Sequence, residues 1–320
     1  MAKQLLVYCV VVISILVSVN GCQNGNGTPQ DNSPFGMQTR SNLVSTVSYP
    51  LYYMTQRIAG DSIAIELIAP PERAPDQWTP DQKQIQTLQE SDLIIANGPG
   101  APFAQWMVRV SLPESRICHT TDNLDLQDFI SVKDYRVVHR HGPEGEHSHP
   151  FMVAQTWLDP KIARKQADQI AAALESRYPE KAAIFQENRQ GLDQDLDRLA
   201  NRMKSIPGGE VLTSTPRLKF LTRAAGLTDT HLLWFDLPDK KSWSEKGEQD
   251  FLGRAKQSSS KSILFDTVPP GWFKNRLEGL GYQTYSLDSF SQGGLPEGAD
   301  SDFIRIMDQN LETLQSAVPQ

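Results

Sequence analysis

The middle of the 320-residue chain reads DPKIARKQADQIAAALESRYPEKAAIFQENRQGLDQDLDRLANRMKS over residues 159–205. The first part of this stretch places apolar residues at helical spacing, namely Ile162, Ala163, Ala167, Ile170, Ala171 and Leu174. Tyr178-Pro179 ends that helix, because proline cannot donate a backbone hydrogen bond. A second helix is then predicted up to Ser205, with an apolar face made by Leu192, Leu196, Leu199 and Met203. A helix of about 25 residues is roughly 38 Å long, so it can run along a whole domain as a spine.

Strand and helix patterns alternate on both sides of this pair of helices. Before it, strands are predicted at 43–48, 62–69, 93–96 and 116–119, and helices at 51–59, 79–90 and 103–110. After it, strands are predicted at 210–213, 231–235, 262–265 and 283–287, and helices at 217–225, 244–257, 272–280 and 302–317. Thr79 is the expected N-cap of its helix, with Pro80 as the first helical residue.

This alternation predicts an α/β protein with two lobes of four strand–helix units, each built on a parallel sheet. The expected boundaries are an N-terminal lobe at 43–158, connecting helices at 159–207 and a C-terminal lobe at 208–320. Ligands of open α/β sheets bind beyond the carboxyl ends of the strands. We therefore expect a ligand cleft between the lobes.

The N-terminus is typical of an export signal. Lys3 precedes the apolar run Leu5–Val19, and Gly21-Cys22 follows shortly after it. This arrangement resembles a bacterial lipobox, which implies a lipoprotein signal peptide at 1–21, cleavage before Cys22 and lipid attachment to it. Ordinary signal cleavage and an uncleaved anchor are the alternatives. Residues 22–42 are rich in Gly, Asn, Pro, Ser and Gln and predict a flexible tether. The globular part is expected to be a monomer held by its lipid on a bacterial membrane, facing the periplasm or the cell surface.

The composition excludes some classes of protein. The formal net charge of -7 argues against a nucleic-acid-binding protein, which usually carries a basic surface. Three cysteines cannot form a disulfide scaffold. Cys118 is expected to be a lone buried thiol.

The strongest chemical signal is the tract HRHGPEGEHSH over residues 139–149, which holds two His-x-His pairs with two glutamates between them. Imidazole is a ligand for Zn, Cu, Ni and Fe, and short His-rich tracts are a metal-binding composition. The glycines and the proline allow the loop to turn back, so that the two pairs can converge. The alternative is a polar surface loop with weak metal affinity. His119 and His231 lie on or near predicted strands, and we expect them to be core residues.

The chain resembles the zinc/manganese solute-binding proteins of ABC importers (cluster A-I) over about residues 43–315. The stretches that carry this resemblance are Tyr49–Tyr52, Arg57–Asp61, Leu67–Pro71, Leu88–Leu93, Asn97-Gly98, Trp157–Pro160, Tyr178–Ala183, Gly226-Leu227 and Leu287-Asp288. The resemblance implies two α/β lobes joined by a long rigid helix, a metal ion between the lobes, and partnership with an ABC permease and its ATPase.

The ligands that the resemblance implies are only partly present. The positions of three family ligands hold Asp76, Gln155 and Thr215, and only the fourth, Asp288, matches the family pattern. Amide and hydroxyl groups are poor ligands for Zn²⁺ or Mn²⁺, so the usual site would hold a hard cation weakly.

We therefore predict one relocated site, built from His139, His141, His147 and His149 with help from Asp288 and Asp76. The expected ion is Zn²⁺, with Mn²⁺ or Fe²⁺ as alternatives. The predicted function is an extracytoplasmic receptor that delivers the metal to an ABC importer. The competing interpretation is a metal chaperone, buffer or scaffold that has lost the transport role. A metalloenzyme using Glu144 or Glu146 as a base has no supporting motif, so we expect no enzyme.

Overall fold

The computed structural model describes residues 42–70, 79–97, 110–140, 146–232, 245–291 and 302–318, all within the unit Thr39–Gln320. For residues 126, 133–140, 146–151 and 245 it describes the backbone only. The predicted signal peptide, the tether up to residue 41, His141 and Asp76 lie outside the described residues. So does nearly all of the helix predicted at 103–110.

The first half contains a parallel four-stranded sheet in the order β2-β1-β3-β4. Its strands are β1 (Leu43–Thr46), β2 (Ala64–Leu67), β3 (Leu93–Ala96) and β4 (Ile117–His119). The helices α1 (Tyr49–Ala59) and α2 (Gln82–Glu90) connect them. The two central strands, β1 and β3, are buried throughout, which is typical of parallel strands covered on both faces.

The second half repeats this topology. Its strands are β7 (Glu210–Thr213), β8 (Thr228–His231), β9 (Ser262–Phe265) and β10 (Gln283–Ser286), in the parallel order β10-β9-β7-β8. The helices are α6 (Lys219–Ala224), α7 (Glu245–Ala255), α8 (Gly271–Gly279) and α9 (Phe303–Ala317). In each half the first strand lies between the second and the third, so the predicted α/β fold with two parallel sheets is confirmed.

Most of the strand predicted at 231–235 lies outside the described residues. The strand that the structure describes here is β8, at Thr228–His231, with a partly exposed polar sequence, TDTH. Because β8 is an edge strand that pairs with β7 alone among the described strands, it needs no apolar run. The apolar residues that follow it attracted the prediction.

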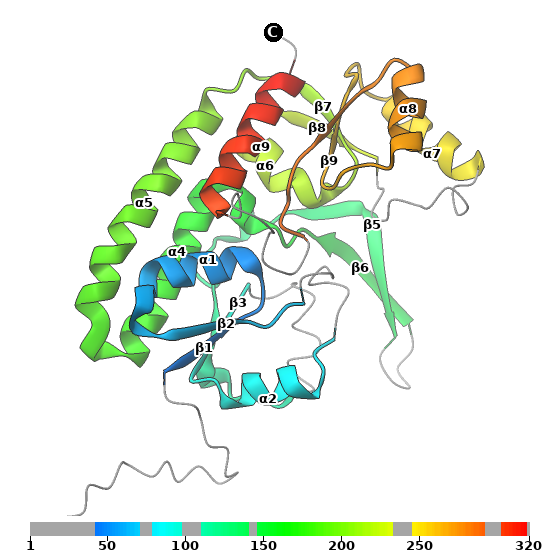
Figure 1. Ribbon diagram of the computed structural model, residues 1–320. Coiled ribbons are helices and arrows are strands. Elements are labelled where there is room, and N and C mark those ends of the chain that lie inside the picture. The colour runs from blue at the N-terminus through cyan, green and yellow to red at the C-terminus, as the bar shows by residue number, and fades with distance from the viewer. Residues whose placement is uncertain are drawn as a thin grey trace, which may run out of the picture. The chain divides into compact units, whose positions relative to one another are not determined.

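The long helices of the middle segment are α4 (Pro160–Arg177) and α5 (Ala182–Lys204). Figure 1 shows α5 running beside α4, with α1 and α9 also packed near it. Ion pairs join α5 to both halves: Asp195 accepts from Arg57 of α1 at 2.9 Å, and Arg198 donates to Asp308 of α9 at 2.8 Å. The 23 residues of α5 therefore form the predicted spine.

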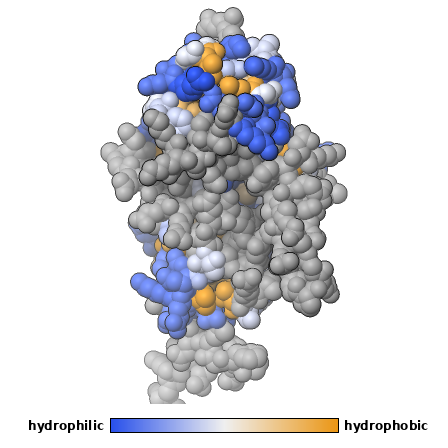
Figure 2. All heavy atoms as spheres, turned by 90° about the vertical axis from the view of Figure 1, so that its right-hand side faces the viewer, coloured by the Kyte–Doolittle hydropathy of each residue, from blue (hydrophilic) through white to orange (hydrophobic). Residues whose placement is uncertain are grey.

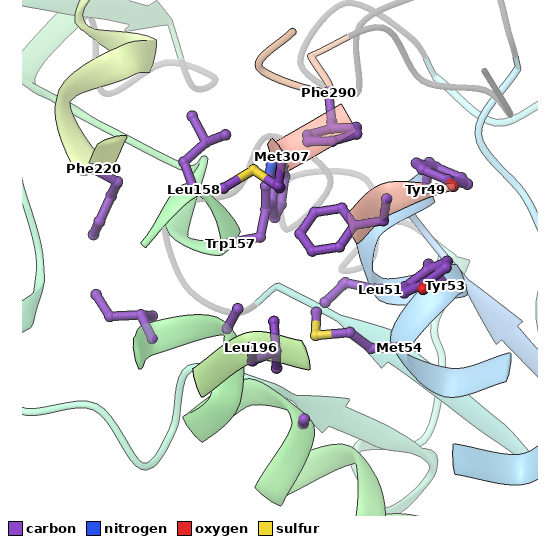
Figure 3. Close-up of a cluster of buried hydrophobic side chains, with 14 of the residues drawn as sticks. Tyr49, Leu51, Tyr53, Met54, Trp157, Leu158, Leu196, Phe220, Phe290 and Met307 are labelled. Atoms are coloured by element: carbon purple, nitrogen blue, oxygen red, sulfur yellow. The ribbon is translucent and has the colours of Figure 1, made fainter. Parts of the chain in front are cut away.

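One hydrophobic cluster extends through both halves, from Val44 and Ile95 to Val211 and Leu264. Aromatic rings make the contact near α1 (Figure 3): the Tyr49 and Phe290 ring centroids lie 5.9 Å apart, and those of Phe290 and Phe303 lie 4.9 Å apart. A smaller hydrophobic cluster is formed by buried residues of β9, α7 and α8 with their neighbours. Cys118 is a buried free thiol, as predicted, and burial raises its pKa to about 12.

Large apolar side chains are seldom exposed among the described residues. Those that are exposed are Ile184, Val268 and Leu280. The face shown in Figure 2 is mostly hydrophilic where its residues are described, with small separate apolar spots. Scattered apolar residues of this kind are normal on protein surfaces and mark no interface. A search of the described part of the chain finds no helix with the length and apolar character of a membrane span.

The histidine tract at 139–149 was expected to be a loop, but all of its described residues lie in a β-hairpin. The strands β5 (Ser131–Arg140) and β6 (Glu146–Met152) pair antiparallel, with an irregularity between Val132 and Arg136. The first strand contains valines and a tyrosine, which favour β-structure. The second, EHSHPFM, has weak strand propensity by itself, and pairing with β5 gives it a partner for its backbone.

Helix α2 begins later than predicted. Its N-cap is Asp81, whose carboxylate accepts from the Gln84 backbone N–H at 2.8 Å while the Gln84 side chain accepts from the Asp81 N–H at 2.8 Å. This capping box satisfies two amides that would otherwise lack partners. Thr79-Pro80 therefore precedes the helix. Short 3-10 turns lie at Gly60–Ser62, Glu114–Arg116, Leu126–Asp128, Thr156–Leu158, Pro179–Lys181 and Pro216–Leu218.

Candidate metal-binding site

The pairing of β5 with β6 places three of the four histidines of the tract on the same face of the hairpin. His139 is the Cα partner of His147, and His149 is the partner of Val137. Residues two apart on a strand lie on the same face of a sheet, so the positions of His139, His147 and His149 share one face. Directly opposed residues have Cβ atoms about 5 Å apart, a spacing at which two imidazoles can reach one ion.

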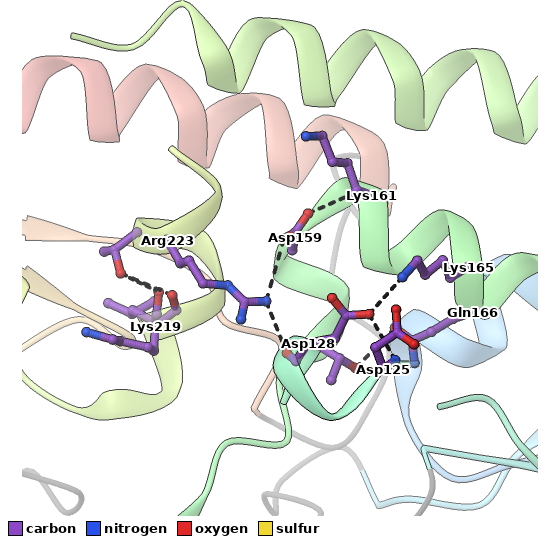
Figure 4. Close-up of polar contacts among 11 residues, drawn as sticks. Asp125, Asp128, Asp159, Lys161, Lys165, Gln166, Lys219 and Arg223 are labelled. Atoms are coloured by element: carbon purple, nitrogen blue, oxygen red, sulfur yellow. Dashed lines mark hydrogen bonds and ion pairs between the residues drawn. The ribbon is translucent and has the colours of Figure 1, made fainter. Parts of the chain in front are cut away.

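The first root of the hairpin, the segment at Asp128 that leads into β5, is bonded to α4 of the middle segment and to the second half (Figure 4). Asp128, three residues before β5, accepts from Lys165 of α4 at 2.7 Å. Its backbone carbonyl accepts from Arg223 of α6 at 3.1 Å, and the same guanidinium lies 3.9 Å from the Asp159 carboxylate. The hydrogen bond from Lys165 lowers the pKa of Asp128, so this carboxylate stays charged. Arg223 thus joins the second half to the start of the hairpin.

The second root of the hairpin, the turn at residues 154–156, lies against the carboxyl end of the first sheet. Asn97, the residue after β3, donates to the carbonyl of Ala154 at 2.6 Å. Its side-chain oxygen accepts from Thr156 at 3.0 Å and from Gln166 of α4 at 2.7 Å. This buried network holds the 154–156 turn, and with it Gln155, against the sheet edge where ligands of parallel sheets bind.

Two of the positions that the resemblance assigns to ligands are occupied with protein contacts. Gln155 is buried, and its amide nitrogen donates to the Ser291 hydroxyl at 3.3 Å. Its oxygen is also buried and has no hydrogen-bond partner among the described residues. The buried Thr215 hydroxyl accepts from the backbone N–H of Arg217 at 3.3 Å and caps the 3-10 turn at Pro216–Leu218. Neither side chain carries a charge that would attract a metal ion.

Asp288, the position that matches the family pattern, is an exposed carboxylate just after β10. It accepts from the backbone N–H of Phe290 at 2.7 Å. Asn310 of α9 holds the backbone of Asp288 by two hydrogen bonds, at 2.9 and 2.8 Å. Desolvation by the surrounding protein raises the pKa of Asp288, and the nearby charge of Asp266 raises it further. The group is fixed in position and reachable from solvent.

Sequence reasoning missed a buried ion pair in the second sheet. Asp266 follows β9 and lies 3.4 Å from the Arg217 guanidinium; both residues are buried. Burial raises the pKa of Asp266, and Arg217 opposes that effect. The signal available in the sequence was the position of Asp266 directly after the buried strand SILF, at a sheet edge where charged groups gather. Because the arginine neutralises it, Asp266 is not a free metal ligand.

No three His, Cys, Asp or Glu side chains come together as a potential metal site where side chains are described. That search does not include the side chains of the histidine tract. His119 and His231 lie on the edge strands β4 and β8, and their side chains are 19% and 17% exposed, so they are mostly buried at the sheet edges and not at the centre of the core. His119 contacts Glu114 at 3.0 Å, and His231 contacts Thr213 at 2.9 Å.

Residues 44–317 match the family described as zinc-uptake complex component A, periplasmic. The chain belongs to this family. The resemblance inferred from the sequence is therefore confirmed, and the protein is a member of a family of binding components and not of enzymes.

Individual relatives agree with this assignment. The high-affinity zinc uptake system protein ZnuA of Bacillus subtilis is 26% identical over 284 residues, covering 86% of this chain and 87% of that relative. The manganese ABC transporter substrate-binding lipoprotein PsaA of Streptococcus pneumoniae is 19% identical over 319 residues, covering 94% of each chain. The Zn(II)-bound ZnuA-like domain of Streptococcus pneumoniae AdcA has a similar fold, with a TM-score of 0.69 at 20% identity, over 87% of this chain and 99% of that one.

Proposed function

We propose that this protein is an extracytoplasmic metal-binding receptor that delivers a divalent transition metal, zinc in particular, to an ABC permease and its ATPase. It acts by capture and release, without covalent chemistry. The observation that carries the proposal is the register of the hairpin, in which three histidine positions share one face. The names of its relatives, which include both zinc and manganese proteins, support a divalent metal as the cargo.

The proposed ligands are His139, His141, His147 and His149, with Asp288 and Asp76 as additional oxygen donors. Zn²⁺ usually takes four ligands from N, S or O atoms, and two or three imidazoles with a carboxylate make a complete set. Since β6 is extended from Glu146 to Met152, His147 lies about 17 Å along the strand from its end. The imidazoles of the tract can therefore bind a metal ion on the hairpin itself. Asp288 is a further ligand where the hairpin lies over the turn after β10.

Zinc is favoured over manganese by donor chemistry. Imidazole is a good ligand for Zn²⁺, whereas Mn²⁺ is better served by carboxylate, carbonyl and water oxygens. A site made mainly of histidines thus selects Zn²⁺, and Fe²⁺ is the next candidate. Because only neutral imidazole binds metal, affinity should fall as the pH drops through about 6.5.

The proposed cellular setting follows from the N-terminus. We propose that Cys22 carries the lipid, that residues 22–42 form the tether, and that the mature protein works as a monomer on a bacterial membrane. The proposed lobes are residues 43–158 and 208–320, joined by the helices at 159–207.

A second function is favoured by a specific observation. Gln155 and Thr215 hold neutral, buried side chains that are bonded to protein where the resemblance expects ligands. A protein that binds metal only on its hairpin could be a buffer or chaperone. Zinc uptake by cells that lack this protein but retain the permease distinguishes the two: a receptor is required for uptake, and a buffer is not.

The binding proposal is tested by calorimetric titration of the mature protein with Zn²⁺. The three proteins compared are the wild type, the double variant His147→Ala with His149→Ala, and Asp288→Ala. His119→Ala is the control, because it removes an imidazole outside the tract. We expect the double variant to lose more than the roughly 10–100-fold that loss of an outer-shell partner costs, and the control to bind like the wild type.

The outcomes separate the possible sites. Unchanged affinity in the double variant would end the proposal of a histidine site. Loss in that variant with no effect of Asp288→Ala would limit the site to the hairpin alone and remove the second half from it. Loss in both variants supports a site that joins the hairpin to the turn after β10.

A further inference from the structure

The two halves of the protein are joined by a small buried hydrogen-bond cluster beside the second root of the hairpin. The Gln155 amide donates to the Ser291 hydroxyl at 3.3 Å, and the Ser291 and Ser289 hydroxyls are 2.6 Å apart. The indole N–H of Trp157 donates to the Ser289 carbonyl at 3.1 Å. We call these four residues, Gln155, Trp157, Ser289 and Ser291, the amide latch.

All four residues of the amide latch are more than nine-tenths buried. Gln155 and Trp157 belong to the segment that follows the hairpin, and the two serines belong to the turn that follows β10. Losing a hydrogen-bond partner leaves a buried polar group unsatisfied, which costs free energy. The contacts therefore add to the connection between the two segments.

Both sides of the latch are fixed independently. On the first side, Asn97 holds the neighbouring carbonyl of Ala154 at 2.6 Å. On the second side, Asn310 holds the backbone of Asp288, and the Phe290 ring packs on Tyr49. With both segments already positioned, the amide and the hydroxyl meet at little further cost in conformational freedom.

We infer that Gln155 is a positioning residue that locks the hairpin root to the turn at Asp288–Ser291 without a metal ion. Its nitrogen is used in the lock, and its buried oxygen has no hydrogen-bond partner among the described residues. The inference rests on the proposed function only in placing the histidine ligands elsewhere, on the hairpin. The turn and the hairpin root then stay together in both the metal-free and the metal-bound protein.

Hydrogen exchange of the backbone amides, followed by mass spectrometry with and without Zn²⁺, tests this role. In the metal-free wild type we expect peptides covering 286–291 to exchange slowly already, before any zinc is added. Gln155→Met keeps an unbranched side chain of similar length and removes the hydrogen bond. It should speed exchange of this turn by about tenfold, the effect of one lost buried hydrogen bond of roughly 1.4 kcal/mol.

Matched variants separate positioning from general damage. Gln86→Met makes the same change at an exposed residue of α2 and should leave the turn unchanged. Ser291→Ala should behave like Gln155→Met, whereas Ser291→Thr retains the hydroxyl and should restore slow exchange. Peptides from β1 and α5 should keep wild-type rates in every variant, because the effect is local.

Two results would overturn the inference. One is wild-type exchange at 286–291 in metal-free Gln155→Met; the other is fast exchange of that turn in the metal-free wild type, since the turn would then be held only when the metal is bound. The zinc content of the same samples is measured separately. A protein that binds no zinc would contradict the proposed function, while the metal-free comparison of variants would still decide the role of Gln155.

Discussion

At the scale of single residues, the two carboxylates that follow β9 and β10 of the second sheet lie in different surroundings. Asp266 is buried against Arg217 after β9, and Asp288 is exposed after β10. Desolvation by the surrounding protein and the nearby charge of Asp266 both raise the pKa of Asp288 and so disfavour its ionisation. A cation would relieve this, which is why Asp288 is the stronger candidate for a metal contact of the two.

The raised pKa of Asp288 predicts a pH dependence of the metal-free protein. Between the unfolded pKa of about 3.9 and the higher folded value, the folded protein binds more protons than the unfolded chain. Stability contributed by protonated Asp288 is thus complete below about pH 3.9 and is lost as the pH rises through the folded pKa. Asp288→Asn keeps the oxygen that accepts from Phe290 and removes the charge.

We expect Asp288→Asn to match the wild type near pH 3.5 and to be slightly more stable at pH 7, by a fraction of a kcal/mol because solvent screens an exposed group. Urea unfolding in the presence of a chelator, from pH 3.5 to 7.5, measures the difference. Asp61→Asn, an exposed carboxylate in the 3-10 turn after α1, is the control. A variant that became less stable than the wild type as the pH rose would contradict the assignment.

At the scale of elements, helix ends and the hairpin depend on different kinds of contact. The α2 capping box is local, since its partners are three residues apart. The hairpin depends on pairing between residues 131–140 and 146–152 and on roots bonded to α4, α6 and Asn97. Local contacts such as the capping box can be predicted from the sequence. The contacts of the hairpin roots with α4, α6 and Asn97 cannot, because their partners are far apart along the chain.

The observed start of α2 predicts different costs for two neighbouring substitutions. Asp81→Ala removes the capping carboxylate and should lower the free energy of unfolding by about 1 kcal/mol. Thr79→Ala should change it little, because Thr79 lies outside the helix and is exposed. Chemical denaturation of both variants makes the comparison. Equal costs, or a larger cost at Thr79, would mean that the helix begins at Pro80.

At the scale of the described molecule, the two sheets share one hydrophobic cluster. Buried residues of β1, β3, α4, α5, β7 and α9 all belong to it. The Tyr53 hydroxyl adds a polar connection, because it donates to Asp302 at 3.0 Å and accepts from Arg57 at 2.7 Å. Parts that share a core in this way lose it together on unfolding.

We therefore expect the mature protein, free of metal, to unfold in a single cooperative transition, although its topology is duplicated. Differential scanning calorimetry should give one peak, with a calorimetric enthalpy equal to the van't Hoff enthalpy. Two separated peaks would show that the halves unfold independently, and would contradict the role of the shared cluster. Tyr53→Phe, which removes the hydroxyl alone, should lower the midpoint and keep the single peak.

The sequence alone determined the parts of this protein that depend on local pattern. Buried runs such as LVST, LIIA and SILF are β-strands in the sheets, and helical spacing on residues 159–205 yields α4 and α5. The clustering of histidines, and the substitutions at Gln155 and Thr215, can also be read directly. The ligand role of the histidines, the lipid on Cys22 and the lobe boundaries stay predictions.

Only the tertiary structure decided what the substituted residues do. Gln155 and Ser291 are 136 positions apart, and Asp266 and Arg217 are 49 apart. No periodicity in a sequence encodes which side chains meet across such distances, because the meeting depends on how sheets and helices pack. The same reason explains the hairpin: its histidine-rich strand has little propensity of its own, and it becomes a strand because β5 lies beside it.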